Sequence, residues 1–390
     1  MRYLLCGLAF ILLPLPIMAQ VETVWTREYD GACRAVAVMP DGGILITGES
    51  RHPQYFGDQN LLLRLNPDGD TLWTRAFGTV AEMDCSEVSE EFYGATGRMK
   101  VSSAMSIRRL FVNPDGSFLT FSDCTEENRQ NCRCLTTWND SGNFVGRVPF
   151  CATGINIIFD LNRTADGQFV AFGNPDPHVM NGNRFFVMRV SVRGDTLDYR
   201  SYEKDDFHFH EVIKPCRDGG YLLAGSSGKT IVSRIDPRGN KLWDYQMDER
   251  GVEFGDVGET DDGGFVIVGH TSRKGSTEAA GVAFKMDARG ALLWQRSFAA
   301  GAECRSRTLD VLDNGELLMG GSFDRRKDAR MFLMLTTNSG DSLWTKEVGH
   351  GEMRGMVKTP DGGYLLAGNY PEGDYPYRWK IILTRVTHIE

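Results

Sequence analysis

The sequence predicts an all-β fold, a seven-bladed β-propeller, and three observations lead to it. A turn motif, Asp-Gly or Asn-Gly between two apolar stretches, occurs seven times along the chain. A second turn motif, which ends in an apolar-Trp pair, follows most of these copies. The chain also ends one strand short of a full repeat, and it begins with a strand that belongs to no repeat.

The first element, residues 1–19, has the features of an export signal. Residues 4–15 are apolar, and Ala19 is a small residue suited to the cleavage position. The apolar stretch is too short and too rich in proline to span a membrane core of about 30 Å. We therefore expect a mature chain that begins at Gln20 and forms one propeller domain, residues 20–390. It is expected to span no membrane and to be secreted, periplasmic or held at the cell surface.

The first turn motif marks seven repeats. Asp-Gly or Asn-Gly between apolar runs is the strongest short signal for a β-hairpin, because the turn needs positive φ. Most copies lie 44 to 52 residues apart, which is the spacing of four-stranded propeller blades. The first interval, of 74 residues, carries an insertion at residues 78–106. The turns begin at Asp41, Asp115, Asp166, Asp218, Asp262, Asn314 and Asp361.

The second turn motif adds two more strands to each repeat. Residues 236–243, Asp-Pro-Arg-Gly-Asn-Lys-Leu-Trp, match residues 66–73, 287–294 and 337–344. In two further copies, Gly146 and Asp198 stand where the others have tryptophan. We name the four strands of a repeat A to D in chain order. The first motif joins A to B, and the second joins C to D.

The two ends of the chain are expected to close the ring. Residues 381–384 form a third strand that no fourth strand follows. Residues 24–27, Val-Trp-Thr-Arg, match a fourth strand such as residues 72–75, Leu-Trp-Thr-Arg. An N-terminal strand that completes the last blade removes the exposed edges at the seam. The alternative is an open sandwich or two smaller β domains, although no linker interrupts the repeat.

The Asp-x-x-Gly-x-x-x-Trp unit of residues 236–243 resembles the tryptophan-docking repeat of quinoprotein-like (PQQ-like) propellers. The chain is thus similar to a secreted bacterial propeller of that kind, over nearly all of its mature length. Enzymes of that family need cofactor ligands inside the ring, and the sequence has no matching motif. The resemblance therefore implies the fold but no activity and no cofactor.

The cysteines predict disulfides. The mature chain keeps eight, an even number behind an export signal. Cys132 and Cys134 lie too close to bond each other, so each is expected to bond elsewhere. Because four cysteines cluster within one blade and its neighbour, we expect at least two bridges among Cys124, Cys132, Cys134 and Cys151. No Cys-x-x-Cys pair indicates a zinc knuckle or a thioredoxin-like site. The rest of the connectivity stays open.

Charge and loop lengths limit the possible partners. The formal net charge of −9 argues against a broad nucleic-acid-binding surface. The long B–C and D–A loops are expected at one end of the ring, where variable loops on a rigid scaffold carry function. Aromatic residues in these loops, such as Tyr55 and Tyr370, suit contacts with sugars or peptides. We expect a monomer whose partner is a carbohydrate or a protein.

One position of strand A points to an anion site. Seven residues before each first turn stand Arg34, Arg108, Phe159, Glu211, Gly255, Arg307 and Arg354. Four arginines at one structural position, near the channel mouth, would favour a carboxylate or sulfate ligand. The alternative is that they form inter-blade salt bridges with carboxylates such as Asp160, Asp256 or Asp310.

A histidine pair adds two candidate ligand-binding residues. His208 and His210 share one strand face at a period of two residues. With a third ligand such as His178 or His270 they could hold a metal ion. The alternative is that they are solvated loop residues, and we assign no metal site.

No motif assigns catalysis. The sequence has no Gly-rich phosphate loop, no GxSxG elbow and no HExxH motif. We expect a non-catalytic extracellular or periplasmic binding or scaffold module, whose ligand is an acidic glycan or a protein. The alternative is a carbohydrate-active enzyme, a lyase or hydrolase acting on acidic polysaccharide. A quinone-dependent dehydrogenase is a third hypothesis, which the resemblance alone suggests.

Overall fold

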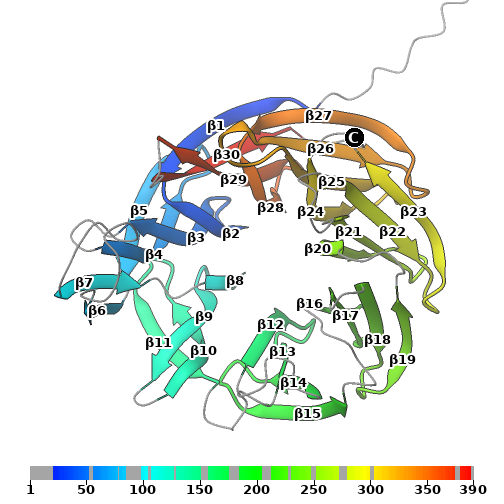
Figure 1. Cartoon of the computed structure of the whole chain (residues 1–390), viewed down its shortest axis with the longest axis horizontal. Coiled ribbons are helices and arrows are strands. Elements are labelled where there is room, and N and C mark those ends of the chain that lie inside the picture. The colour runs from blue at the N-terminus through cyan, green and yellow to red at the C-terminus, as the bar shows by residue number, and fades with distance from the viewer. Residues whose placement is uncertain are drawn as a thin grey trace, which may run out of the picture.

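Seven β-sheets stand around a central axis in the computed structural model of the chain (Figure 1). Strand A of each sheet lies nearest the axis and strand D lies outermost. The structure describes residues 21–51, 56–77, 79–84, 98–103, 107–126, 129–150, 157–174, 184–203, 212–226, 230–246, 252–271, 279–298, 303–373 and 378–387. This arrangement confirms the predicted seven-bladed propeller with four-stranded antiparallel blades.

The blades follow one another in chain order, each built from strands A, B, C and D. Blades 1 to 4 are β2 (Ala32–Val38), β3 (Ile44–Arg51), β4 (Phe56–Leu65), β5 (Thr71–Phe77); β8 (Ile107–Val112), β9 (Phe118–Glu126), β10 (Arg129–Trp138), β11 (Phe144–Pro149); β12 (Ile157–Arg163), β13 (Phe169–Asn174), β14 (Arg184–Val190), β15 (Thr196–Glu203); and β16 (Val212–Pro215), β17 (Tyr221–Ser226), β18 (Thr230–Ile235), β19 (Lys241–Gln246). Blades 5 to 7 are β20 (Val252–Glu259), β21 (Phe265–Thr271), β22 (Gly281–Met286), β23 (Leu292–Phe298); β24 (Cys304–Val311), β25 (Leu317–Phe323), β26 (Arg330–Thr336), β27 (Ser342–His350); and β28 (Glu352–Lys358), β29 (Tyr364–Glu372), β30 (Arg378–Val386), β1 (Thr23–Asp30).

The N-terminal strand closes the last blade, as the sequence predicts. Strand β1 pairs antiparallel with β30 from Thr23↔Val386 to Asp30↔Lys380. Ahead of it, Val21 is buried in the apolar cluster between blades 6 and 7. The ring therefore has no free edge at its seam.

The insertion after blade 1 forms a hairpin of its own. Strands β6 (Thr79–Asp84) and β7 (Arg98–Ser103) pair with each other, and β7 runs parallel to the start of β4 at Phe56↔Val101. The sheet of blade 1 is thereby extended at the start of strand C. The helix in the described residues is a short 3₁₀ turn, η1 (Arg326–Asp328). The described part of the chain holds no helix with the length and apolar character needed to cross a membrane.

The first turn motif is stabilised by an ion pair that sequence analysis missed. The Asp41 carboxylate accepts a hydrogen bond from the Gly43 amide and pairs with Arg64 of strand C, 2.6 Å away. In blade 5 the equivalent Lys285 is the largest cause that lowers the pKa of Asp262 to about 2. Five blades share this pair: Asp41–Arg64, Asp166–Arg189, Asp218–Arg234, Asp262–Lys285 and Asp361–Arg385.

The second turn motif joins neighbouring blades through its tryptophan. The Trp243 indole lies against Gly290 in the C–D turn of the next blade, where an added Cβ would come within 2.5 Å of the ring. Its Nε1 donates to the Ala288 carbonyl at 3.0 Å. Blade 2 lacks the tryptophan, and there Val148 packs against Gly194 instead. Each turn glycine thus makes room for the outer strand of the preceding blade.

The core is divided among the blade interfaces. Seven apolar clusters, built mainly from strands B and C, occur in the structure, and each combines residues of two adjacent blades. The cluster shared by blades 7 and 1 contains Leu365 and Ile381 from one and Ile46 and Leu63 from the other. This packing holds strand A of every blade at the wall of the central channel.

Candidate functional site

The candidate site is the channel mouth at the start of strand A, where the strands share a backbone irregularity. Within the described residues, six A strands carry a register shift seven residues before the first turn. The extra residues are Arg34, Arg108, Phe159, Gly255, Arg307 and Arg354. A β-bulge re-aims the side chain of its extra residue relative to the pleat. The position that sequence analysis singled out is therefore the bulge in these six blades.

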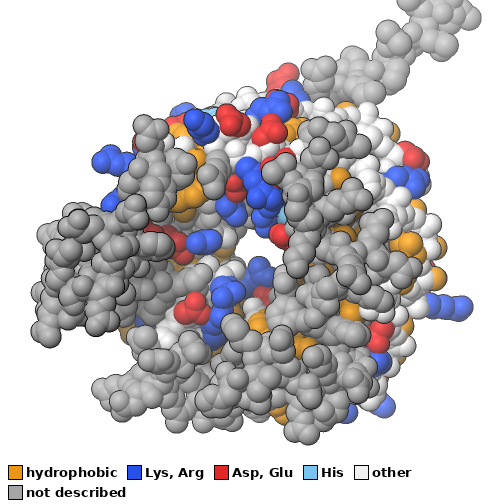
Figure 2. All heavy atoms as spheres, in the orientation of Figure 1, with side chains coloured by type: hydrophobic (Ala, Val, Ile, Leu, Met, Phe, Trp, Pro, Cys, Tyr) orange, Lys and Arg blue, Asp and Glu red, His pale blue; other side chains and the backbone are white. Residues whose placement is uncertain are grey.

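The four bulge arginines occupy consecutive blades, which are blades 6, 7, 1 and 2. We call Arg34, Arg108, Arg307 and Arg354 the arginine arc. Figure 2 shows Lys and Arg side chains gathered around the central opening. In blade 5 the bulge residue is Gly255, where an added Cβ would lie 2.5 Å from the Ser306 carbonyl oxygen. The arginines thus form an arc on one part of the ring rather than a complete circle.

The two middle members of the arc are paired within their own blades. Arg34 donates twice to Glu49, with Nε–Oε1 at 3.1 Å and Nη2–Oε2 at 2.9 Å. Arg354 donates through Nη2 to Glu352 at 3.0 Å, and its Nε is buried without a hydrogen-bond partner. Glutamates therefore offset much of the charge in the middle of the arc.

The two end members of the arc, Arg108 and Arg307, differ from the middle two in their contacts. Among the described residues, neither Arg108 nor Arg307 takes part in an ion pair. Burial, followed by the charges of Arg354 and Arg305, lowers the pKa of Arg307 below its ordinary value. The nearby charges of Glu253 and Glu352 oppose this shift without cancelling it, so Arg307 stands among both cations and carboxylates.

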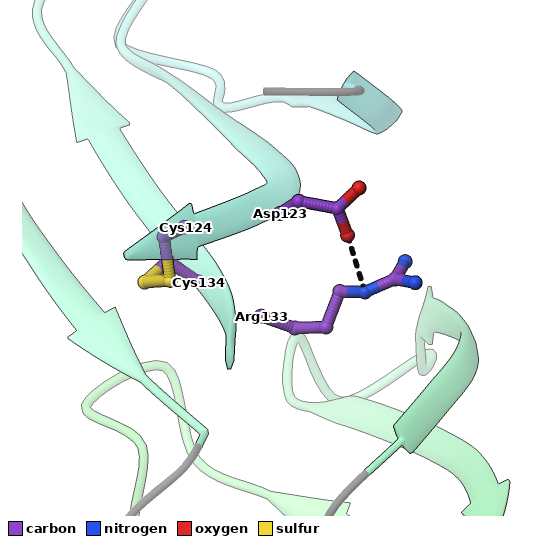
Figure 3. Close-up of a disulfide and its surroundings, with 4 residues drawn as sticks. All are labelled: Asp123, Cys124, Arg133 and Cys134. Atoms are coloured by element: carbon purple, nitrogen blue, oxygen red, sulfur yellow. Dashed lines mark ion pairs between the residues drawn. A yellow bond between two sulfur atoms is a disulfide. The ribbon is translucent and has the colours of Figure 1, made fainter. Parts of the chain in front are cut away.

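Arg108 at the other end has a second cation beside it. Burial, and then the charge of Arg108, lowers the pKa of Arg133 to about 10 even though Arg133 pairs with Asp123 at 2.6 Å. The Nη1 of Arg133 is buried and has no hydrogen-bond partner. Figure 3 shows this ion pair beside the disulfide between Cys124 and Cys134, which links β9 to β10.

That disulfide is the part of the cysteine prediction on which the structure bears. Cys124 and Cys134 are bonded, with a Cα–Cα distance of 5.8 Å. Cys151 and the side chain of Cys132 lie outside the described residues, so the second predicted bridge stays a prediction. Three other cysteines, Cys33, Cys216 and Cys304, are free and buried. The even number of cysteines therefore did not imply that all of them pair.

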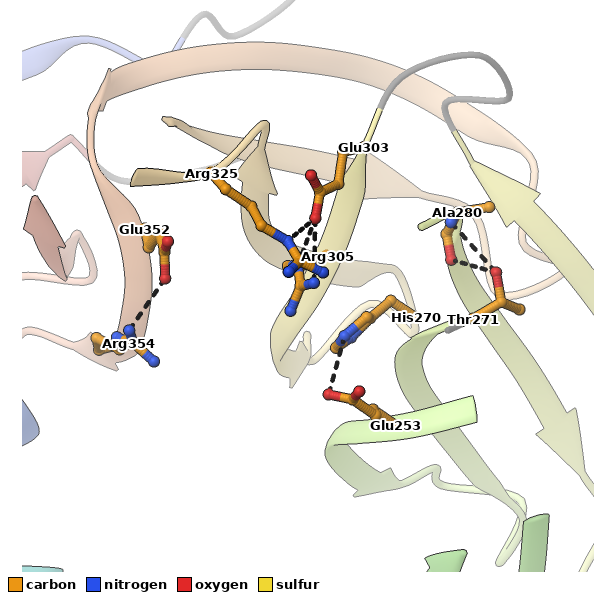
Figure 4. Close-up of polar contacts among 9 residues, drawn as sticks. All are labelled: Glu253, His270, Thr271, Ala280, Glu303, Arg305, Arg325, Glu352 and Arg354. Atoms are coloured by element: carbon orange, nitrogen blue, oxygen red, sulfur yellow. Dashed lines mark hydrogen bonds and ion pairs between the residues drawn. The ribbon is translucent and has the colours of Figure 1, made fainter. Parts of the chain in front are cut away.

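Blades 5 and 6 place further charged groups beside Arg307. The Glu303 carboxylate pairs with both Arg305 and Arg325. His270 is fully buried and its Nε2 lies 3.2 Å from a Glu253 oxygen, yet neither ring nitrogen has a well-formed hydrogen bond. Burial, with the nearby charge of Arg305, holds the pKa of His270 well below its usual range. Figure 4 shows Arg305 near the His270 ring, and Arg354 with Glu352 on the neighbouring blade.

The aspartates that we weighed as partners of the arc make other contacts. Asp160 pairs with Arg109 of blade 2 at 2.8 Å, and Asp256 pairs with Lys214 of blade 4 at 2.7 Å. Asp310 accepts a hydrogen bond from Tyr364 of blade 7. Inter-blade ion pairs are therefore present at the channel wall, but in the described residues they do not use the arc.

The histidine pair lies elsewhere in the chain. His208, His210 and the expected third ligand His178 lie outside the described residues, as does Glu211 of blade 4. Within the described ranges, no three His, Cys, Asp or Glu side chains are placed to share a metal ion. The other expected third ligand, His270, contacts Glu253 instead.

Sequence analysis missed two cations that the fold brings to the arc. Arg305 lies two residues before Arg307 on the same strand, so the period of two could have indicated it. Arg133 lies on strand C, and only the pairing of β9 with β10 places it beside Asp123. No local signal links Arg133 to Arg108.

Solved structures of other proteins are similar to this chain in fold. No protein-family description and no curated protein sequence matches the chain. Among solved structures, the WD40 domain of Neurospora crassa Pan2 is similar, with a TM-score of 0.53 and 12% identity over 90% of this chain and 89% of that one. Sqt1 from Chaetomium thermophilum is similar with a TM-score of 0.50 and 11% identity, over 95% and 100% of the two chains. At such identities the likeness shows the β-propeller fold alone.

Proposed function

We propose that this protein is a non-catalytic binding propeller that takes a carboxylate- or sulfate-bearing ligand at its channel mouth. The observation that carries the proposal is the arginine arc, in which four adjacent blades place a guanidinium at the same bulge. Guanidinium groups bind carboxylates and sulfates through paired, charge-assisted hydrogen bonds. In a protein with a net charge of −9, a concentrated positive patch also attracts anions selectively.

The alternative, a lyase or hydrolase on acidic polysaccharide, needs a general base that reaches the substrate. Of the two histidines in the described residues, His350 contacts Glu28 of the outermost strand of blade 7, whereas His270 stands beside a carboxylate and two arginines near the arc. Its side chain is fully buried, however, and so is not placed to take a proton from a polysaccharide. This geometry favours binding over catalysis.

We place this binding module outside the cytosol and regard it as a monomer of the quinoprotein-like, bacterial type. The export signal that the sequence predicts at residues 1–19 and the Cys124–Cys134 disulfide support this location. Mass spectrometry of the exported protein should find Gln20 at its N-terminus, and size-exclusion chromatography should find one chain per particle. Visible absorbance of the purified protein tests for a bound quinone.

The binding proposal is tested by calorimetric titration with polygalacturonate. The variant carrying Arg307→Ala and Arg354→Ala should lose binding while its thermal unfolding stays close to that of the parent. A matched control changes Arg238 and Arg289 to Ala, because these exposed arginines lie in C–D turns at the opposite end of the blades. An equal loss of binding in both variants would show that binding depends on the net charge of the protein and not on the arc. An ultraviolet assay for unsaturated products tests the lyase alternative on the same samples.

A further inference from the structure

We infer that the arginine arc acts as two separate anion subsites, one on blade 6 and one on blade 2, which a single acidic oligosaccharide bridges. This inference rests on the proposed function and specifies its ligand. It requires a ligand with at least two anionic groups on one stiff chain.

The first step is the uneven charge along the arc. Glu49 and Glu352 take up hydrogen bonds from the two middle arginines, on blades 1 and 7. The described residues hold no ion-pair partner for Arg307 or Arg108 at the two ends. A ligand anion gains most where no protein carboxylate competes for the guanidinium, so the ends of the arc are the preferred contacts.

The blade-6 subsite is Arg307 with Arg305. Both guanidinium groups come from the start of β24, and Arg305 shares Glu303 with Arg325, so one carboxylate serves two cations. Arg307 is half-buried, which reduces the screening of its charge by water. An anion bound here would relieve the repulsion among Arg305, Arg307 and Arg354.

The blade-2 subsite is Arg108 with Arg133. Arg108 is exposed, and Arg133 has a buried Nη1 without a partner. The Cys124–Cys134 bond links the two strands that carry Asp123 and Arg133, and so holds this guanidinium in place. A second preorganised anion contact therefore stands three blades along the ring from the first, with blades 7 and 1 between them.

The fixed positions of these groups favour a stiff ligand. The bulges and the packed blades hold the subsites at a constant separation, so a ligand whose charges already have that spacing loses little conformational freedom on binding. Once one end is bound, the second contact forms within the complex at a high effective concentration. Acidic sugars repeat a carboxylate along a stiff chain, whereas an acidic peptide must be ordered first.

The test compares ligand lengths and single-subsite variants. Galacturonic acid and oligogalacturonates of two to six units are titrated into the parent, R307Q, R108Q and the control R238Q/R289Q. Affinity should rise steeply at one chain length in the parent and in the control. In R307Q and in R108Q this rise should vanish, with a loss of about tenfold or more for the longest ligand and little change for the monomer. Circular dichroism checks that each variant is folded.

Each contrary result has its own meaning. If affinity in the parent rises only in proportion to the number of carboxylates, or if R108Q binds as the parent does, the two-subsite inference is wrong while the proposed binding function stands. If hexaglutamate shows the length dependence and oligogalacturonates do not, the ligand is an acidic peptide. If neither ligand binds the parent, the proposed function fails together with the inference.

Discussion

Asp160 connects three blades, and its removal is the sharpest test of how the ring is held together. The side chain is almost fully buried in strand A of blade 3. Its carboxylate accepts hydrogen bonds from the amides of Leu161 and Ile213, at 2.9 and 3.1 Å, and it pairs with Arg109. Ile213 belongs to blade 4 and Arg109 to blade 2. One carboxylate therefore links blades 2, 3 and 4 at the channel wall.

The expected cost of Asp160→Ala follows from the groups left behind. Two buried amides lose their acceptor, and each unsatisfied donor costs about 1–3 kcal/mol. The ion pair adds less, because the Arg109 side chain is 38% exposed and can reach water. We expect the free energy of unfolding to fall by about 4 kcal/mol. Asp160→Asn should cost less, because its amide oxygen still accepts one of these hydrogen bonds.

Urea unfolding measures the effect, with the midpoint expected to fall at a constant m-value. Asp68→Ala is the matched control, because this exposed turn carboxylate should change stability by less than about 0.5 kcal/mol. A double-mutant cycle with Arg109→Ala separates the ion pair from the amide contacts. A loss below about 1 kcal/mol for Asp160→Ala would show that Asp160 does not link the blades as described.

Deleting residues 21–27 should lower the free energy of unfolding by about 5 kcal/mol or more, because it removes a buried valine and most of the pairing with β30; an unchanged melting temperature would contradict the closure. Because the pKa of His270 is lower in the folded chain, the unfolded chain binds more protons as the pH falls below about 6.5. Stability should therefore decrease on acidification from that pH, and His270→Gln should flatten this dependence in denaturant titrations at several pH values. Reducing the bond between Cys124 and Cys134, which are 10 residues apart, should cost about 3 kcal/mol in chain entropy, measured by unfolding with and without reductant. An identical unfolding curve in both conditions would mean that the bridge contributes nothing.

Local signals were sufficient for the repeat and for the bulge position. A turn such as Asp41-Gly42-Gly43 needs positive φ at Gly42, observed at 80°, and this requirement is met within four residues. Counting back from such turns found Arg34 and its equivalents because the six A strands with a described bulge have the same length between bulge and turn. The Asp41–Arg64 pair was missed, although an arginine or lysine in strand C accompanies the turn aspartate in five blades.

Long-range packing decided the rest. The sequence by itself determined a seven-fold β repeat, an N-terminal strand that completes the last blade, and an arginine at one position of four blades. Only the tertiary structure decided that Glu49 and Glu352 pair with the two middle arginines, and that Asp160 pairs with Arg109 rather than with the arc. The physical reason is that an ion pair depends on distances across blades, which chain closure and interface packing set, whereas a turn depends on the backbone of a few consecutive residues.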